Sequence, residues 1–332
     1  MKKRRPIIGI TMGDPGGIGP EILVSALTDP SIYKICQPLV LGDINIITKA
    51  LKLKKSSLKL NIIDSPEKGL YVHGLTDIIP LSELTDDSAA PGMPTAETGK
   101  AMLVYITKAV DLAMENKIKA IATCPITKTA LKMAGSRFHG HTELIASRTG
   151  TEKYAMMLAG ERLKVVLVTI HIPVSEISRQ LTIEKVLNTI KITDDSLKRR
   201  FGVNKPLIAV AGLNPHAGED SMFGTEEEEI ITPAVKLAKE KGIKVSGPSP
   251  PDTLFFHAAS GKYDAVVCMY HDQGLIPFKM LHFKDGVNTT LGLPVIRTSV
   301  DHGTAYDIAW KGTADHTSLV EAIKLAAHQA AQ

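Results

Sequence analysis

Short apolar runs alternate with amphipathic stretches along most of the chain. Runs at residues 7–12, 37–43, 58–64, 119–124, 164–170, 206–213 and 264–269 are rich in β-branched residues and have the length of buried strands. Apolar positions recur at helical spacing in residues 44–55, 98–116, 182–198, 225–241 and 316–331, and Asp252 is placed to cap a helix that runs to Ser260. This alternation predicts the α/β class with a largely parallel sheet.

Length and composition narrow the class of protein. At 332 residues the chain exceeds what one hydrophobic core usually serves, so we expect two domains. A net charge of +4 with dispersed basic residues argues against nucleic acid as a partner. Three separated cysteines favour reduced thiols in a cytoplasmic protein, and the apolar runs are too short for a membrane span.

Three apolar strands each lead directly to a histidine. His171 follows VVLVTI, His216 follows LIAVAGLNP, and His271 follows AVVCMY. Ligands of open parallel sheets bind at the carboxyl ends of strands, and neutral imidazole is a common ligand of divalent cations. A single histidine of this kind is usually structural, but the repeated placement favours a metal or catalytic role. Asp272 is placed to orient His271 as a metal ligand.

The segment GDPGGIGPE follows the first strand and precedes a helix. Such a glycine loop either presents N–H groups to an anion or makes a tight turn. Gly17 and Gly19 fit the first two places of the dinucleotide fingerprint, but Ile22 occupies the third. Both interpretations stay open. Asp43, which ends the next strand, is expected to cap a helix rather than bind a ribose.

Polar residues of two other regions are candidates for binding a charged substrate. His139, His141 and Thr142 precede a predicted helix, after a strand that leads to Lys128. Lys279, Asn288 and Arg297 lie beyond the last long strand, and the guanidinium of Arg297 is suited to a carboxylate or phosphate.

Eight ordered motifs resemble one family. GDPGGIGPE, ATCPITK, FHGHTE, TIHIPV, GLNPHAGE, PPDTLF, YHDQGLIPFK and VNTTLGLPVIRTSVDHGTAYDIA are similar to segments of the 4-hydroxythreonine-4-phosphate dehydrogenase family of pyridoxal phosphate biosynthesis. Two of them, GDPGGIGPE and HGTAYDIA, also resemble elements of the isocitrate and isopropylmalate dehydrogenases. The resemblance covers the chain from Gly9 to Asp307.

The resemblance implies two α/β/α domains around a cleft, as in the isocitrate and isopropylmalate dehydrogenases. The first domain would comprise residues 1–130 and 286–332 and carry the elements near the cofactor, and the second would comprise residues 131–285 and carry the metal histidines. It also implies a homodimer whose active site takes residues from both subunits.

The resemblance further implies residue roles. His171, His216 and His271 would hold one divalent metal, for which Zn, Mg, Mn and Co are candidates. His141, Thr142, Lys279, Asn288 and Arg297 would bind the phosphorylated substrate. Gly13, Asp14, Gly17, Gly19, His302, Gly303, Thr304 and Asp307 would lie near NAD or NADP. Lys279 and Asp252 are the candidates for the catalytic proton acceptor.

The implied reaction is oxidation of 4-phosphooxy-L-threonine at the C3 hydroxyl, followed by decarboxylation. A branch of the same family acts on 4-phosphothreonate and 4-phosphoerythronate, which carry a hydroxyl in place of the amine. A metal-dependent hydrolase is the competing class, although a hydrolase has no use for HGTAYDIA, and an acyltransferase on a related scaffold is a third. Trp310 stands where relatives often carry glycine, which would reshape the edge of the cofactor region.

Overall fold

A computed structural model describes residues 5–332 and divides into two compact units. Unit 1 comprises residues up to 152 together with 293–331, and unit 2 comprises residues 153–292. The boundaries therefore fall after residues 152 and 292, whereas the expected ones fell after residues 130 and 285. The segment 131–152 is part of unit 1 because its helix packs on the long helix of that unit.

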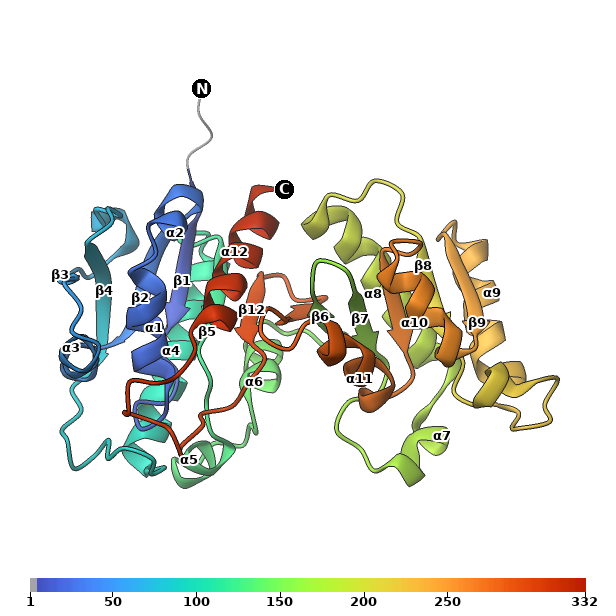
Figure 1. Cartoon of the computed structure of the whole chain (residues 1–332), viewed down its shortest axis with the longest axis horizontal. Helices are drawn as coiled ribbons and strands as arrows, with labels where there is room; N and C mark the ends of the chain where they lie inside the picture. Colours follow the sequence, from blue (N-terminus) through green and yellow to red (C-terminus); the bar gives the residue numbers. More distant parts are fainter. Residues whose placement is uncertain (1–4) are drawn as a thin grey trace. The chain divides into compact units, whose positions relative to one another are not determined.

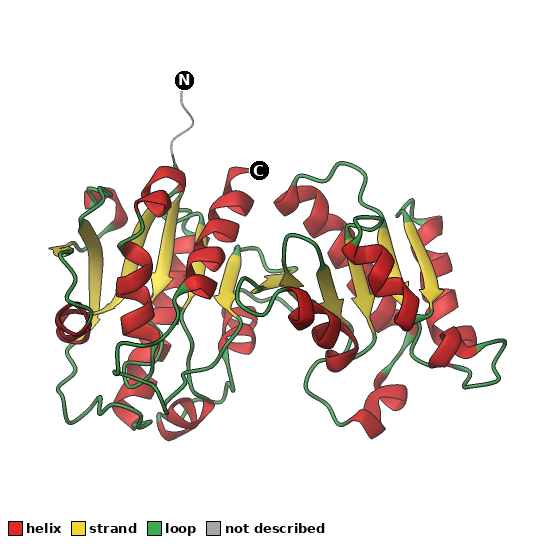
Figure 2. Ribbon diagram, viewed as in Figure 1, coloured by secondary structure: helices red, strands yellow, loops and turns green. Residues whose placement is uncertain are grey.

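Unit 1 contains a parallel sheet with strand order β3-β4-β2-β1-β5-β12. Its strands are β1 (Ile7–Thr11), β2 (Gln37–Asp43), β3 (Lys59–Ile62), β4 (Leu75–Ser82), β5 (Ala120–Thr123) and β12 (Arg297–Val300). The chain moves outward from β1 to β2 and then returns to β5. This reversal places helices on both faces of the sheet, as Figures 1 and 2 show.

The helices of unit 1 form two groups. One group, in which α12 contacts both α1 and α2, comprises α1 (Gly19–Leu27), α2 (Pro30–Ile35), α3 (Ile44–Leu53) and α12 (Thr317–Ala331). The other comprises α4 (Ala96–Met114), α5 (Lys128–Met133) and α6 (His141–Arg148), and η1 (Pro66–Lys68) is a single 3₁₀ turn.

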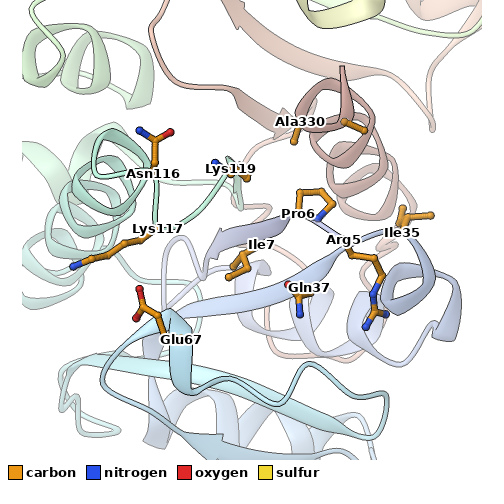
Figure 3. Close-up of a pocket in the computed structure, with 11 residues that line it drawn as sticks. Arg5, Pro6, Ile7, Ile35, Gln37, Glu67, Asn116, Lys117, Lys119 and Ala330 are labelled. Atoms are coloured by element: carbon orange, nitrogen blue, oxygen red, sulfur yellow. The ribbon is translucent and has the colours of Figure 1, made fainter. Parts of the chain in front are cut away.

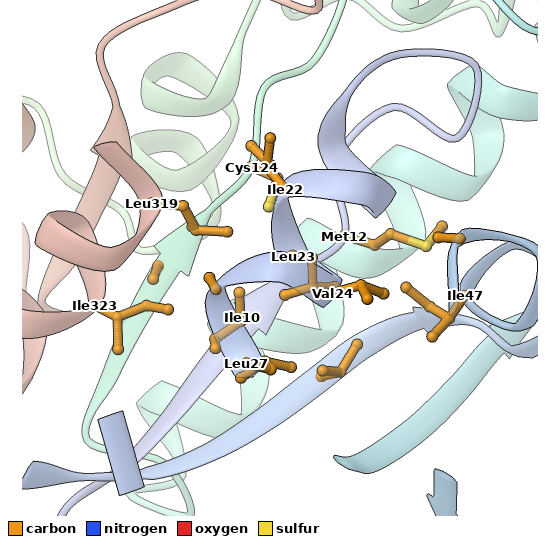
Figure 4. Close-up of a cluster of buried hydrophobic side chains, with 14 of the residues drawn as sticks. Ile10, Met12, Ile22, Leu23, Val24, Leu27, Ile47, Cys124, Leu319 and Ile323 are labelled. Atoms are coloured by element: carbon orange, nitrogen blue, oxygen red, sulfur yellow. The ribbon is translucent and has the colours of Figure 1, made fainter. Parts of the chain in front are cut away.

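The core of unit 1 forms where α1 and α12 cover the strands. Ile10 and Met12 of the β1 region meet Leu23 of α1 and Ile323 of α12, all of them essentially inaccessible to solvent (Figure 4). Because β1 lies in the middle of the sheet, this core holds the loop that follows β1 in place.

Unit 2 has strand order β11-β6-β7-β10-β8-β9. Its strands are β6 (Ala155–Ala159), β7 (Lys164–Leu167), β8 (Ile208–Ala211), β9 (Val245–Ser249), β10 (Ala265–Cys268) and β11 (Val287–Leu291). β6 is antiparallel to both β7 and β11. β7, β10, β8 and β9 are parallel.

The helices of unit 2 are α7 (Ile177–Gln180), α8 (Ile183–Phe201), α9 (Thr232–Glu240), α10 (Pro251–Ala259) and α11 (His271–Leu281), with the short turns η2 (Val174–Glu176), η3 (Pro215–Gly218) and η4 (Glu227–Ile231). Leu254 of α10 and Phe278 of α11 join Val165, Val266 and Ala209 in one buried cluster. Helices α10 and α11 therefore cover one face of the sheet. Helix α8 contacts five of the strands and packs against α9.

Most expected elements are present, and the α/β class is confirmed. Asp43 caps α3 as expected, since its carboxylate accepts from the N–H groups of Asn45 and Ile46. The expectation that Asp252 caps α10 was wrong: Pro250 is the N-cap residue and Asp252 lies in the first turn. Helix α11, which begins at His271, was not expected, because Gly274 and Pro277 disguise its pattern. Among the helices of residues 5–332, none combines the length and apolar character needed to cross a bilayer.

Candidate functional site

Three neighbouring parallel strands of unit 2 present the predicted histidines at one edge of the sheet. In the order β7-β10-β8, His171 lies four residues beyond Leu167, His271 three beyond Cys268, and His216 five beyond Ala211. The strands run in the same direction, so their carboxyl ends meet. The placement inferred from the sequence is therefore realised in the fold.

His171 and His271 form a close pair. Their ring centroids are 5.6 Å apart and the ring planes make an angle of 44°. Two imidazoles that bind one tetrahedral cation through nitrogen have ring centres roughly 5 Å apart, given metal–nitrogen bonds of about 2 Å. The Nδ1 atom of His271 is 2.7 Å from the Asp272 carboxylate, which directs its Nε2 atom outward. Asp272 thus occupies the orienting position expected for it.

His216 has two partners of its own. Its Nδ1 atom is 2.7 Å from Glu219, and its ring packs edge-on against Phe223. Residues 216–221 all have positive φ, and five of the six are not glycine. Within residues 5–332, no group of three histidine, cysteine or carboxylate side chains is gathered closely enough to hold a cation. The three strand ends are neighbours in the sheet, but the three imidazoles do not form a cation site in the described residues.

The side chains nevertheless suit a divalent cation. His271 and His216 each engage a carboxylate through Nδ1, which leaves Nε2 as the ligand atom in both. The histidine pair has the spacing of two ligands, and His216 follows the strand next to β10. Imidazole nitrogens bind Zn²⁺, Mn²⁺ and Co²⁺ more readily than Mg²⁺, which prefers oxygen.

The other predicted residues of unit 2 lie on three different elements. Lys279 is in α11, eight residues or about 12 Å along the helix from His271, and its ammonium group is 5.9 Å from the Phe283 ring centroid. Asn288 lies in β11, and its Oδ1 atom is buried without a hydrogen-bond partner among residues 5–332. Asp252 is exposed on α10. A buried, unsatisfied amide oxygen is typical of a position that meets a ligand.

Unit 1 contains a buried cation. Arg297, the first residue of β12, is 4% exposed, and its Nη2 atom donates to Thr123 Oγ1 at 3.0 Å. Burial lowers the pKa of Arg297 to about 10, so the guanidinium stays charged at neutral pH. Desolvation, aided by the Arg297 charge, lowers the pKa of the buried His141 well below its ordinary value. His141 is therefore a neutral imidazole beside a fixed positive charge.

His141 begins helix α6, and Thr142 follows it in the first turn. Gly140 is the N-cap residue and no side chain caps this end. The Nε2 atom of His141 is buried and has no hydrogen-bond partner among residues 5–332. Open N–H groups at a helix start, an unsatisfied imidazole nitrogen and a nearby guanidinium together favour an anion such as a phosphate.

The glycine loop between β1 and α1 is a packing element. Residues 8–27 are all buried, and Gly13 has φ +76° with no room for a Cβ atom beside Pro125. The N–H groups of residues 14, 16, 17 and 18 donate to acceptors within unit 1. These contacts favour the tight-turn interpretation, since the loop has few free N–H groups for a phosphate.

The segment 302–310 holds the glycine loop through hydrogen bonds. Ile18 N donates to Thr304 O at 3.1 Å, and Tyr306 Oη donates to the buried Asp14 carboxylate at 2.6 Å. Trp310 donates from its backbone to Glu21 and from its indole to Pro15 O. A Cβ atom at Gly17 would lie 3.0 Å from Thr304. Trp310 therefore anchors the segment 302–310 to the glycine loop. Tyr306 also holds this loop, a role that was not predicted from the sequence although Tyr306 lies within HGTAY.

Three predicted residues of the segment 302–310 are at least partly accessible to solvent. His302 is half-buried, and its Nε2 atom has no hydrogen-bond partner among residues 5–332. Gly303 and Asp307 are exposed. This segment, rather than the loop beneath it, offers groups that a cofactor could reach.

A cavity of about 800 Å³ lies elsewhere in unit 1, at the amino ends of β1, β2 and β5 (Figure 3). Arg5, Ile7, Gln37 and Lys119 line it, and none of the predicted site residues does. Ligands of open parallel sheets bind at the opposite edge. We therefore place the candidate site at the carboxyl ends of the strands and not in this cavity.

Comparison with known proteins identifies the family. The sequence model of the family described as "Pyridoxal phosphate biosynthetic protein PdxA" matches residues 34–326. A 4-hydroxythreonine-4-phosphate dehydrogenase of Desulforapulum autotrophicum is 66% identical over 330 residues, covering 99% of this chain and 97% of that protein. The chain belongs to the PdxA family. A D-threonate 4-phosphate dehydrogenase of Cupriavidus necator is a more distant member, 47% identical, with 98% and 97% coverage.

A solved PdxA-family structure has the same fold. The crystal structure of a 4-hydroxythreonine-4-phosphate dehydrogenase from Klebsiella pneumoniae superposes with a TM-score of 0.93 at 43% identity, covering all of both chains. Membership of a family of dehydrogenases confirms the resemblance drawn from the eight motifs, and it favours an oxidoreductase over a hydrolase.

Proposed function

We propose that this PdxA-family protein oxidises 4-phosphooxy-L-threonine at its C3 hydroxyl with NAD or NADP, and that the product is then decarboxylated. The observation that carries the proposal is the 66% identity to a protein named for this activity, over almost the whole chain. The unsatisfied buried atoms of His141, Asn288 and His302 support it, since each belongs to a residue expected to meet a ligand.

In this proposal the phosphate of the substrate binds at the start of α6. Arg297 provides two parallel N–H donors and a permanent charge, while Thr142 and the first N–H groups of α6 complete the anion site. His141 is held neutral, so it binds by hydrogen bonding rather than by charge. Within unit 2, Lys279 and Asn288 stay candidates for binding polar groups of a substrate.

The divalent cation would be held by His171, His216 and His271. When bound, it supplies positive charge that favours ionisation of a substrate hydroxyl. Asp272 holds the His271 ring in the orientation of a ligand, and Glu219 does the same for His216. His302, Gly303 and Thr304, with Asp307 nearby, would hold the nicotinamide cofactor, which would supply the hydride acceptor. Lys279 and Asp252 remain the two candidates for the proton acceptor.

The proposed homodimer has a surface available for it. Ile276 and Met280 of α11 and Phe283 just beyond it are 61%, 82% and 78% exposed. Ile276 and Met280 are four residues apart and lie on one side of α11, and Phe283 lies just past the end of the helix; we call these three exposed side chains the apolar stripe. Because α11 begins at His271, a partner covering this stripe would lie beside the histidine pair. We expect a cytoplasmic location, in keeping with three buried cysteines that form no disulfide.

The second candidate substrate is 4-phospho-D-threonate, since relatives at 43–47% identity bear D-threonate names. The two substrates differ at C2, where one carries an ammonium group and the other a hydroxyl. To distinguish the two substrates, the protein needs an acidic or hydrogen-bond-accepting group near C2.

A side-by-side turnover assay decides between them. Purified protein is supplied with each substrate, NAD or NADP, and Zn²⁺, Mn²⁺, Co²⁺ or Mg²⁺, and reduction is followed at the nicotinamide absorbance band. We expect the higher kcat/KM for 4-phosphooxy-L-threonine. A higher value for phosphothreonate would assign the protein to the sugar-acid branch. No reduction with either substrate would refute the dehydrogenase assignment.

A further inference from the structure

Buried hydrogen bonds join the strand ends that carry His171 and His271. Thr169 is 6% exposed, and its hydroxyl donates to Met269 O at 2.7 Å. The backbone N–H of Thr169 donates to the same oxygen at 3.2 Å. These bonds lie beyond the last ladder residues of β7 and β10, two residues before each histidine. They extend the pairing of the two strands almost to the imidazoles.

Gln273 joins the ends of β10 and β8. Its side chain is 7% exposed, its Oε1 accepts from Met269 N at 2.7 Å, and its Nε2 donates to Gly212 O at 2.6 Å. Met269 is therefore held on both sides, through its oxygen by Thr169 and through its N–H by Gln273. Gln273 lies in the first turn of α11, two residues after His271.

Glu227 holds the loop that leads to His216. Its Oε1 accepts from the N–H groups of Leu213 and Asn214, both at 2.7 Å, and its Oε2 accepts from the Asn214 amide at 2.9 Å. The residue is 5% exposed and begins the π-helical turn η4. A Cβ atom at Gly212 would lie 2.8 Å from Ala217 and 3.1 Å from Glu227 Oε1, so the loop is pressed closely onto this carboxylate.

We propose that Thr169, Gln273 and Glu227 are positioning residues: they form one buried polar frame that holds the three histidine-bearing strand ends in register for a shared cation. This inference rests on the proposed metal site. Each member of the frame lies beside a different junction, and together the members connect β7 to β10, β10 to β8, and β8 to the loop of His216.

Packing and stability alone do not require buried polar side chains at these positions. A buried carboxylate such as that of Glu227 is costly to desolvate, and apolar residues of similar volume commonly serve stability as well or better. A hydrogen-bonded frame instead specifies direction, because each donor and acceptor must keep its angle. The frame holds the backbone as far as Asn214, and the left-handed turn 216–221, which begins with His216, follows directly after it.

Glu227 offers the sharpest test. Glu227→Leu removes all three bonds, whereas Glu227→Gln removes the charge but keeps an acceptor for Leu213 and Asn214. Glu229→Leu and Glu229→Gln are the matched controls, because Glu229 is the exposed residue two positions further along. Co²⁺ is titrated into each purified full-length protein, and both the dissociation constant and the visible absorption spectrum of the bound ion are recorded.

We expect Glu227→Leu to weaken Co²⁺ binding about tenfold or more and to shift the ligand-field bands, since the half-buried N–H groups of Leu213 and Asn214 lose their acceptor. Glu227→Gln should bind within about threefold of the wild type, and both Glu229 variants should match it. If Glu227→Leu keeps the wild-type affinity and spectrum while the separate variant His216→Ala binds Co²⁺ more weakly, the frame is refuted and the metal site is not. Absence of Co²⁺ binding by the wild type would overturn the metal site and the frame with it.

A second readout does not depend on metal. Hydrogen exchange of the metal-free proteins should show the Leu213 and Asn214 amides protected in the wild type and in Glu227→Gln, and exposed in Glu227→Leu. If Glu227→Leu fails to fold, Thr169→Val replaces it, because valine is isosteric and removes only the hydroxyl bond to Met269. That variant should bind Co²⁺ about threefold or more weakly. Wild-type affinity and an unchanged spectrum in a folded Thr169→Val protein would refute the frame.

Discussion

The hydrogen bond between Tyr306 and Asp14 offers a sharp test of how the glycine loop is held. Asp14 is fully buried, and its carboxylate accepts from Tyr306 Oη at 2.6 Å and from Gly16 N at 2.9 Å. Tyr306→Phe removes the first donor and leaves the shape of the side chain almost unchanged. A hydrogen bond to a charged group contributes about 1.5–3 kcal/mol, so the variant should lose roughly this much unfolding free energy at neutral pH.

The unfolding free energy lost in Tyr306→Phe should be larger at neutral pH than at acidic pH. Burial raises the pKa of Asp14 above its ordinary value, while the bonds from Tyr306 and Gly16 lower it. With a folded-state pKa above the unfolded one, the stabilising effect of protonating Asp14 is fully present below the unfolded pKa and is lost as pH rises through the folded pKa. Tyr306→Phe raises that folded pKa further. The variant should therefore be destabilised most at neutral pH and only by about 0.5–1.5 kcal/mol once Asp14 is protonated.

Urea unfolding followed by circular dichroism measures both values, near neutral pH and near pH ~4, where a free carboxyl is half protonated. Tyr154→Phe is the control, because it removes the hydroxyl of a half-buried tyrosine that has no part in holding the glycine loop. An equal loss at both pH values, or a loss below about 0.5 kcal/mol at neutral pH, would refute the reasoning.

The remaining predictions concern the proposed site. Arg297→Lys should raise KM about tenfold or more while kcat falls less, because lysine lacks the paired donors of the guanidinium; an unchanged KM would exclude Arg297 from the phosphate site. His216→Ala should abolish turnover with an unaltered circular dichroism spectrum, and full activity in that variant after chelation would exclude His216 as a ligand. Lys279→Met should raise KM yet retain Co²⁺ binding, whereas His271→Ala should lose the metal; loss of Co²⁺ in the Lys279 variant would contradict this division. Met280→Asp should shift the sedimentation coefficient from dimer to monomer by placing a charge in the apolar stripe, with Lys284→Asp as an exposed control, and an unshifted dimer would place the interface elsewhere.

Some parts of the site were accessible from the sequence because they depend on local pattern. A β-prone apolar run followed by a histidine places that histidine beyond the carboxyl end of a strand, whatever the rest of the fold. Asp272 and Asp43 were likewise identified correctly, since their partners are one to three residues away. The eight motifs indicated the family for the same reason, being short and contiguous.

Other parts were decided only by tertiary contacts. The motif GDPGGIGPE does not reveal that the N–H groups of Asp14 and Ile18 are already used, because their acceptors Pro125 and Thr304 are far away in the sequence. Tyr306 and Trp310 acquire their roles from Asp14 and Glu21, some 290 residues earlier. The same holds for Gln273, whose acceptor Gly212 directly follows β8, 61 residues earlier.

What the sequence determined by itself was therefore the class, the order of most elements and the identity of the residues at the strand ends, since each follows from periodicity or from a contiguous motif. What only the tertiary structure decided was which strand ends are neighbours, that His171 and His271 meet while His216 faces Glu219, and which buried polar groups join them. The physical reason is that strand order and side-chain direction depend on contacts between segments distant in sequence. No local pattern encodes those contacts.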